Sequence, residues 1–196
     1  MPATLEVPAS AKKDAAALAA KFTILAQKEF RGELTLVVNR AQFHDIAAFL
    51  RDTLGYTYLI DISSVDHFGG EPRYEVVYEL QNFERADHLR LKYTVSEDDC
   101  TAPTVIDLWA TADWHEREVF DMMGIKFTGH PDLRRILMWE GYPFHPLRKD
   151  FPLAGKDSDA AGVAFSRAAP LAGGPFVTSA SGGDTQDREP RSREIE

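Results

Sequence analysis

The sequence contains a single cysteine, Cys100, among 196 residues. One cysteine excludes a disulfide within the chain. It also excludes an iron–sulfur cluster held by this chain alone, because such clusters need about four thiolate ligands. If the protein works with clusters, other chains hold them.

Long apolar segments are missing as well. No run of apolar residues approaches the roughly 20 that a helix needs to cross a bilayer. Residues 1–10 also lack the charged and then apolar layout of a signal peptide. We therefore expect a protein of cytoplasmic origin whose membrane contact, if any, is indirect.

Glycine-rich phosphate loops are absent too. Gly69-Gly70 and Gly173-Gly174 lack the flanking pattern of a Rossmann or Walker turn. We expect neither an NADH site nor a flavin site on this chain.

Positive charge is scarce: 22 Lys and Arg face 31 Asp and Glu, for a net charge of -9. Such a surface repels nucleic acid and anionic lipid. Only the segment 130–150 departs from this balance, because it holds four basic residues and three acidic ones: Arg134, Arg135, Arg148 and Lys149 against Asp132, Glu140 and Asp150. So balanced a patch does not suit DNA, and it suits ion pairs with a protein neighbour.

The first half of the chain shows helical and strand periodicities. With 44% hydrophobic residues, the sequence as a whole can supply one core of ordinary size. Residues 14–29 predict an Ala-rich helix, 33–38 a strand, and 39–54 a helix that begins at Asn39 and ends before Gly55. Residues 56–61 predict another strand, and the chain then turns between residues 63 and 72.

Two strands have the clearest pattern in the sequence. Residues 73–81 and 87–95 alternate apolar and polar side chains and are joined by a short polar link, which predicts an antiparallel hairpin. Its apolar face is available to the two earlier helices. The fold class is therefore α+β: helices packed on one face of a mixed, mostly antiparallel sheet, followed by an extended C-terminal strap and tail.

The segment with the highest concentration of charged, aromatic and turn-forming residues begins at Asp113. Asp113 and Glu116 have the spacing of a capping box, and Gly124 suits the left-handed residue that ends a helix. Arg117 and Asp121 are four residues apart and can pair on that helix. Pro131 suits the start of a short helix over residues 133–137. Beyond it, four of the residues from 141 to 152 are glycine or proline, so 139–153 should be an extended, stiff strap.

At these residues the chain resembles the family of the 30 kDa subunit of respiratory complex I, the C subunit of bacterial NADH-quinone oxidoreductase. The likeness covers two runs, EREVFDMMGIKFTGHPDLRRIL and HPLRKDFPL. The residues that match the family pattern are Glu116, Arg117, Glu118, Asp121, Gly124, Gly129, His130, Pro131, Asp132, Leu133, Arg134, Arg135, Pro146, Leu147, Arg148, Lys149, Asp150, Phe151 and Pro152. One departure is Phe144-His145, where many members have Gly-His, and it affects the connecting loop.

The resemblance implies a function and a division of the chain. Residues 1–128 would form the family's α/β domain with the signature helix, 129–153 an interface strap, and 154–196 a low-complexity tail that is disordered in isolation. The chain would be a non-redox structural subunit in the peripheral arm of a proton-translocating NADH-quinone oxidoreductase. Flavin mononucleotide, iron–sulfur clusters and quinone would belong to other subunits.

The resemblance also implies partners and a location. The matched residues would form the subunit interface, chiefly with the 49 kDa (D) subunit and also with B and I type subunits. No nucleic acid is expected. The protein would lie at the cytoplasmic face of the plasma (inner) membrane, as a peripheral part of a membrane complex.

Three alternatives remain at this point. One is the homologous subunit of a membrane-bound hydrogenase or a ferredoxin-dependent complex. A second is a stand-alone enzyme that uses Glu116 or Glu118, although no nucleophile accompanies them. A third is a metal site at His115, His130 and His145, whose spacing fits no known ligand set. We favour structural roles, with Glu118 paired to Arg134 or Arg135.

Overall fold

The computed structural model describes residues 6–152. The chain divides between residues 140 and 141 into two units, of which the described parts are residues 6–140 and 141–152. The first unit contains the following elements: α1 (Ala9–Ala19), β1 (Ile24–Phe30), β2 (Glu33–Val38), a 3-10 turn η1 (Arg40–Gln42), α2 (Phe43–Asp52), β3 (Tyr58–Asp66), β4 (Tyr74–Asn82), β5 (Asp87–Val95), β6 (Thr101–Pro103), α3 (Ala112–Met123) and β7 (Lys126–Thr128). The predicted tail, 154–196, lies outside the described residues.

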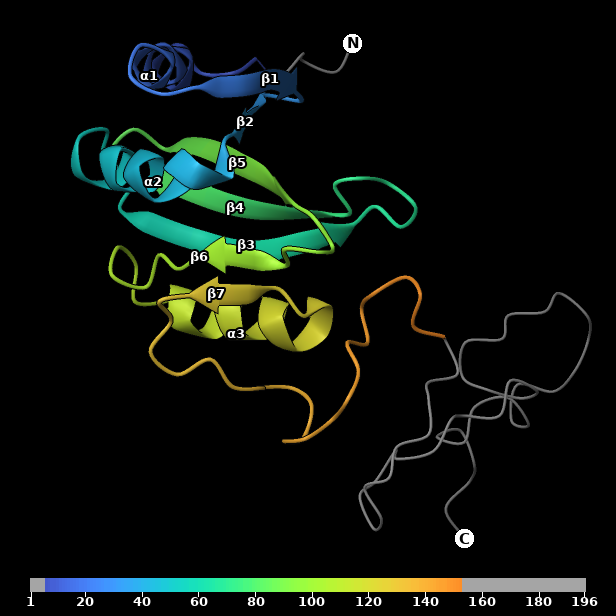
Figure 1. Ribbon diagram of the computed structural model, residues 1–196. Helices are drawn as coiled ribbons and strands as arrows, with labels where there is room; N and C mark the ends of the chain where they lie inside the picture. The colour runs from blue at the N-terminus through green and yellow to red at the C-terminus, as the bar shows by residue number, and fades with distance from the viewer. Residues whose placement is uncertain (1–5, 153–196) are drawn as a thin grey trace, which may run out of the picture. The chain divides into compact units, whose positions relative to one another are not determined.

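A five-stranded sheet organises this unit, in the order β1-β2-β5-β4-β3. Only β2 and β5 run parallel, and the other three pairings are antiparallel. Figure 1 shows α2 against this sheet and α3 beyond β3, next to the small parallel pair of β6 and β7. The α+β class with a mixed, mostly antiparallel sheet is thereby confirmed.

The core lies on the apolar face of the predicted hairpin. Alternate residues of β4 and β5 are buried there, as their period of two predicts. The ring of Phe43, on α2, packs 4.4 Å from that of Tyr78 and 4.6 Å from that of Tyr93, measured between centroids. On the opposite face Glu79 pairs with Arg90 and His88, so the polar side of the hairpin is neutralised within the sheet.

The predicted helix over residues 14–29 is wrong in its second half. The helix ends at Ala19, and Ile24–Phe30 form edge strand β1. The signal for this strand is Arg31-Gly32, where both residues have positive φ, 50° and 82°. A two-residue turn of that kind matches the twist of a hairpin and fixes β1 against β2.

Two other boundaries differ from the expectation. Strand β3 starts at Tyr58 and continues to Asp66, five residues beyond the predicted end, because it pairs with β4 along that whole length. The sequence pattern does not indicate strands β6 and β7. Each has only three residues, which is too short to show a period.

A buried polar network fastens α1 to the sheet. Asp14 and Asp87 are both buried, and both carboxylates accept hydrogen bonds from Arg85, at 2.5 Å and 2.8 Å. Tyr56 also donates its hydroxyl to Asp14, at 3.1 Å. One arginine therefore neutralises two buried acids from distant parts of the chain.

We predict that Arg85→Ala destabilises the fold, because it leaves two buried carboxylates without a cation. The expected loss is about 2–4 kcal/mol in the free energy of unfolding, measured by urea denaturation of the full chain. The exposed Lys13→Ala on α1 is the control. Equal stability of the two variants would contradict this role of Arg85.

Candidate functional site

The candidate site is the segment 116–153, which contains the two runs that match the family pattern and is called the signature segment here. Helix α3 (Ala112–Met123) carries its first part. The helix begins at Ala112 after Thr111, so Asp113 lies in its first turn and does not cap it. The predicted capping box is therefore wrong: Thr111 provides no side-chain cap, and Glu116 points elsewhere. The predicted end is confirmed, because Gly124 has the left-handed φ of 80°.

Glu116 faces the interior and holds the loop before α3. Its side chain is fully buried. One carboxyl oxygen accepts the hydroxyl of Thr104 at 2.6 Å, and the other accepts the backbone N–H of Val105 at 2.8 Å. Burial raises the pKa of Glu116 to about 7, although these two hydrogen bonds act in the opposite direction. No local sequence pattern indicates this contact, since Thr104 lies twelve residues earlier in the chain.

Asp121 holds the segment after the helix. Its carboxylate accepts three consecutive backbone N–H groups, from Ile136, Leu137 and Met138, at 3.0, 2.7 and 2.8 Å. Arg135 adds an ion pair at 2.5 Å. Burial opposes ionisation of Asp121, but the backbone donors and Arg135 outweigh it and lower the pKa.

This arrangement corrects two predictions. Residues 133–137 form no helix, because the N–H groups of Ile136 and Leu137 are used by Asp121 and not by a helical ladder. Arg117 does not pair with Asp121 either. It donates to the carbonyl oxygens of Arg134 and Arg135, at 3.2 and 3.4 Å. Helix α3 thus binds the segment 134–138 through two side chains, the acid Asp121 and the base Arg117.

Glu118 does not pair with Arg134 or Arg135, so that hypothesis is wrong. Arg135 is bound to Asp121, and Arg134 pairs with Asp132 at 2.9 Å on the surface. The Glu118 side chain is exposed. Within residues 6–152 it takes part in no ion pair or hydrogen bond. Glu116 and Glu118, two residues apart, point to different sides of α3.

The turn after β7 packs tightly against the loop that Glu116 holds. Gly129 has a φ of 88°, and a Cβ atom there would lie 3.2 Å from the methyl carbon of Thr104. His130 accepts the N–H of Asp132 at 3.0 Å and donates to the carbonyl of Asp113 at 3.3 Å. Pro131 lies between His130 and Asp132 in the sequence. The residues from Gly129 to Asp132 therefore form one turn.

The histidines do not meet at a metal site in the part of the chain that is described. His115 pairs with Asp61 at 3.1 Å, and His130 satisfies backbone groups as above. No group of three potential metal ligands occurs among residues 6–152. No helix in that range is long and apolar enough to span a membrane.

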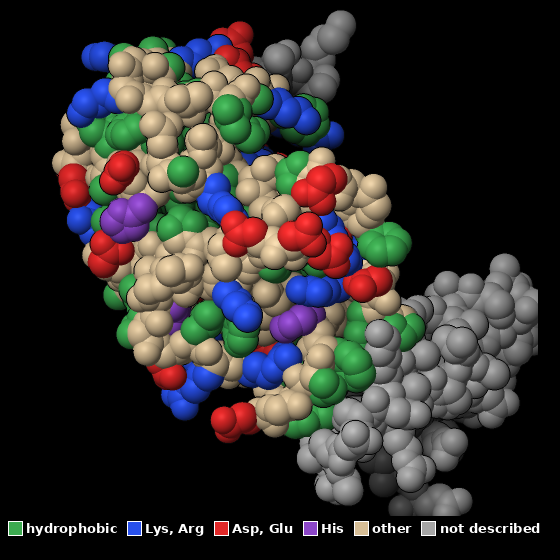
Figure 2. All heavy atoms as spheres, viewed as in Figure 1, with side chains coloured by type: hydrophobic (Ala, Val, Ile, Leu, Met, Phe, Trp, Pro, Cys, Tyr) green, Lys and Arg blue, Asp and Glu red, His purple; other side chains and the backbone are tan. Residues whose placement is uncertain are grey.

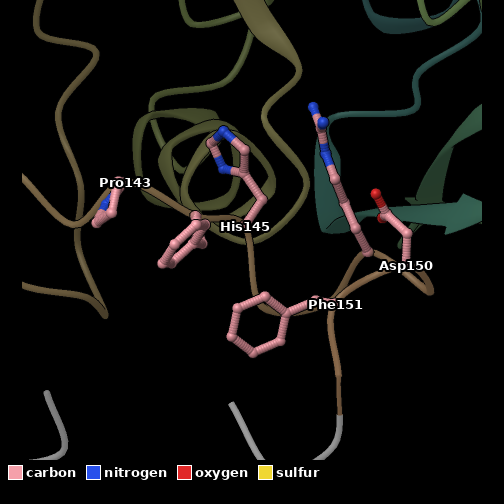
Figure 3. Close-up of a pocket in the computed structure, with 6 residues that line it drawn as sticks. Pro143, His145, Asp150 and Phe151 are labelled. Atoms are coloured by element: carbon pink, nitrogen blue, oxygen red, sulfur yellow. The ribbon is translucent and has the colours of Figure 1, made fainter. Parts of the chain in front are cut away.

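The rest of the signature lies in the second unit. Pro143, Phe144, His145, Arg148, Asp150 and Phe151 surround a small cavity of about 120 Å³, and Figure 3 shows four of them labelled around it. The ring of Phe144 packs 5.6 Å from Tyr142 and 5.9 Å from Phe151. Lys149 and Asp150 are exposed, and Pro146 and Arg148 are half-buried. No helix or strand occurs in 141–152, as the prolines predict.

Surface charge is mixed. On the face drawn in Figure 2, acidic and basic side chains are interspersed with hydrophobic ones, and no large area has a single sign. Sequence reasoning missed that three apolar side chains of α3 and the signature segment are exposed, Trp114, Leu137 and Leu147, because exposure is set by the fold.

We predict that Glu116 makes stability depend on pH. Its pKa is raised from 4.5 to about 7 in the folded chain, so between these values the folded state binds more protons than the unfolded state. The free energy of unfolding should therefore fall as pH rises from about 4.5 to 7, by up to roughly 3 kcal/mol from this group. Glu116→Gln imitates the protonated acid and should remove that contribution. The measurement is the difference between the two proteins in urea unfolding at pH 5 and pH 8, and a difference that does not change with pH would refute it.

We predict that Asp121→Ala loosens the segment 134–138. Three backbone N–H groups lose their acceptor, so hydrogen exchange at residues 136–138 should accelerate by about a hundredfold. Mass spectrometry of deuterium uptake measures this change. Glu118→Ala, on the exposed side of the same helix, is the control and should leave exchange there unaltered.

The chain is similar to known proteins over most of the described residues. The family model described as "Respiratory-chain NADH dehydrogenase, 30 Kd subunit" matches residues 36–157. The C subunits of several bacterial NADH-quinone oxidoreductases are similar: that of Geobacter sulfurreducens is 49% identical over 70% of this chain and 85% of its own length. That of Geotalea uraniireducens is 47% identical over 70% and 84%.

Solved structures share the fold. A trypsin-resistant fragment (1-134) of Nqo5 has a TM-score of 0.56 at 32% identity, over 63% of this chain and 99% of that one. A chain of a membrane-bound sulfane sulfur reductase, an archaeal respiratory membrane complex, has a TM-score of 0.65 at 24% identity, over 73% and 86%. The match of the family model, together with these relatives, shows that the chain belongs to the family of the 30 kDa subunit of respiratory-chain NADH dehydrogenase.

Proposed function

We propose that this chain is a non-catalytic, structural subunit of the peripheral arm of a proton-translocating NADH-quinone oxidoreductase. The assembly would transfer electrons from NADH through flavin and iron–sulfur clusters to quinone, with every one of these groups on other subunits. Its family membership and the names of its relatives support the assembly.

One observation carries the structural role. The buried acids of the signature, Glu116 and Asp121, are each satisfied by backbone or hydroxyl groups of this chain. A catalytic acid or base must reach a substrate, and neither of these carboxylates is open to one. The motif therefore serves to fix two loops in place, and the isolated chain should have no activity.

The partners follow from the family resemblance. We propose the 49 kDa (D) subunit as the main neighbour, with B and I type subunits beside it, at the cytoplasmic face of the plasma (inner) membrane. The exposed signature residues on α3, on the following turn and on the strap around Arg148 and Lys149 would form the contact surface, while the buried ones hold that surface in shape. Aromatic and arginine side chains, which are abundant there, commonly carry much of the energy of protein interfaces.

We predict that Arg148→Glu weakens assembly and leaves the first unit folded. The tagged full chain is purified from membranes in mild detergent, and the recovered subunits and the NADH-to-quinone activity are measured. Reversing one interface charge should reduce recovery of the complex by about tenfold. Lys13→Glu, a charge reversal on α1, is the matched control. Normal assembly of the Arg148 variant would contradict this contact.

The same purification tests the function itself. Recovery of the wild-type chain with subunits that bind NADH and flavin supports the proposal. Recovery with hydrogenase or ferredoxin-dependent subunits would replace it, and a chain recovered alone would refute it.

A further inference from the structure

Strand β1 (Ile24–Phe30) is an open edge of the five-stranded sheet. Among residues 6–152 only β2 pairs with it, and six of its seven residues are exposed. The opposite edge strand, β3, packs against α3. Figure 1 shows β1 at the top of the view, beside α1. Folded proteins commonly cover or interrupt such an edge, because its unpaired N–H and C=O groups can bind another strand.

The β1–β2 hairpin sets which backbone groups of β1 point outward. The two-residue turn Arg31-Gly32 makes the pair on either side of it, Phe30 and Glu33, a hydrogen-bonded pair. Hydrogen-bonded and non-hydrogen-bonded pairs alternate from there along an antiparallel ladder. Gln27 and Glu29 therefore direct their N–H and C=O groups away from β2, where a further strand can reach them.

A cavity lies beside the end of β1. It has a volume of about 400 Å³, and its lining comes from the start of α1, the residues before it and the β1–β2 hairpin: Glu6, Val7, Lys12, Glu29, Phe30, Arg31 and Gly32. The ring of Phe30 is 60% exposed. A strand that pairs with β1 can therefore place a side chain against an apolar wall, which adds specificity to the backbone hydrogen bonds.

The side chains at this edge carry positive charge that the described residues do not neutralise. Lys28 and Arg31 are exposed, and within residues 6–152 neither takes part in an ion pair. They lie over the ring of Phe30, 5.9 Å and 5.1 Å from its centroid. The nearby acid, Glu29, is paired with Lys12 at 2.8 Å. An incoming strand with acidic side chains would complement both cations.

We propose that β1 binds an extended acidic segment of another protein chain as a sixth strand of the sheet. In the proposed assembly that chain is a neighbouring subunit, so the inference rests on the proposed function. The outward N–H and C=O groups of Gln27 and Glu29 bind its backbone. Lys28, Arg31 and the cavity beside Phe30 select its side chains.

Charge argues against a second copy of this chain as the occupant. Lys28 lies at the centre of the part of β1 with regular register, residues 26–30, so two antiparallel β1 strands would bring two lysines together. Lysine on an edge strand is a common protection against such pairing. The net charge of -9 also makes two copies repel each other.

Hydrogen exchange of single amides tests the inference on the unmodified protein. The tagged full chain is measured isolated and again in the assembly purified from membranes in mild detergent. The amides of Gln27 and Glu29 should exchange freely in the isolated chain and about a hundredfold more slowly in the assembly. Those of Lys28 and Phe30, which face β2, are the internal control and should be protected in both.

Two variants at one position separate the backbone from the side chain. Gln27→Pro removes the outward N–H and spares the β1–β2 ladder, since an edge strand tolerates proline where its N–H faces solvent. Gln27→Ala keeps that N–H and loses only the side chain. In the assembly, Gln27→Pro should speed exchange at Glu29 by about tenfold, whereas Gln27→Ala should equal wild type. Thermal unfolding of the isolated variants reports whether each is folded.

A second pair of variants tests the charge. Lys28→Glu should speed exchange at Gln27 and Glu29 in the assembly by about tenfold, because it repels an acidic strand. Lys13→Glu is the matched control, since Lys13 is an exposed lysine of α1 that does not line the cavity. An equal effect of the two reversals would contradict the acidic character of the occupant.

The exchange measurement also identifies a wrong occupant. Equal exchange of the Gln27 and Glu29 amides in the isolated chain and in the assembly would overturn the inference. Protection already present in the isolated chain would overturn it too. The occupant would then be another part of the same chain if gel filtration shows a monomer, and a second copy if it shows a dimer. A chain recovered from membranes without partners would refute the proposed function, and the inference with it.

Discussion

The two buried carboxylates of α3 are the constraint on which the signature region depends. Glu116 fixes the loop that enters the helix, through Thr104 and Val105. Asp121 fixes the segment that returns over it, through three consecutive N–H groups and Arg135. Since residues 129–140 contain no helix, and strand β7 ends at Thr128, these side-chain contacts substitute for the hydrogen bonds that a regular element would make.

The two acids are held in different ways, and this difference has an electrostatic cause. Asp121 meets four donors, one of them a cation, so its charged form is favoured in spite of burial. Glu116 meets two neutral donors, and burial dominates. A single helix therefore carries one acid that stays ionised and one whose proton is exchanged near neutral pH. Glu118, one residue from Arg117, is exposed to solvent.

Much of the fold could be predicted from the sequence, because the period of β4 and β5 and the turn residues report local backbone preferences. The buried faces of both strands and the end of α3 at Gly124 agree with those patterns. Strand β1 was not predicted, because its Ala- and Leu-containing sequence also permits a helix. Its pairing with β2 through the turn at Arg31-Gly32 decides for the strand. For the site, sequence similarity identified the residues but not their partners. Glu116 with Thr104, and Asp121 with residues 136–138, are contacts between segments that no local periodicity links.

The signature acids of α3 divide their roles, with Glu116 and Asp121 turned inward to hold the chain and Glu118 turned outward to the surface. An electron cryomicroscopy map of the intact assembly tests this division most directly. We expect Glu116 to keep its contacts with Thr104 and Val105 in that assembly, and Asp121 to keep its contacts with residues 136–138. Glu116 or Asp121 turned away from these partners and toward a cofactor or quinone would contradict it.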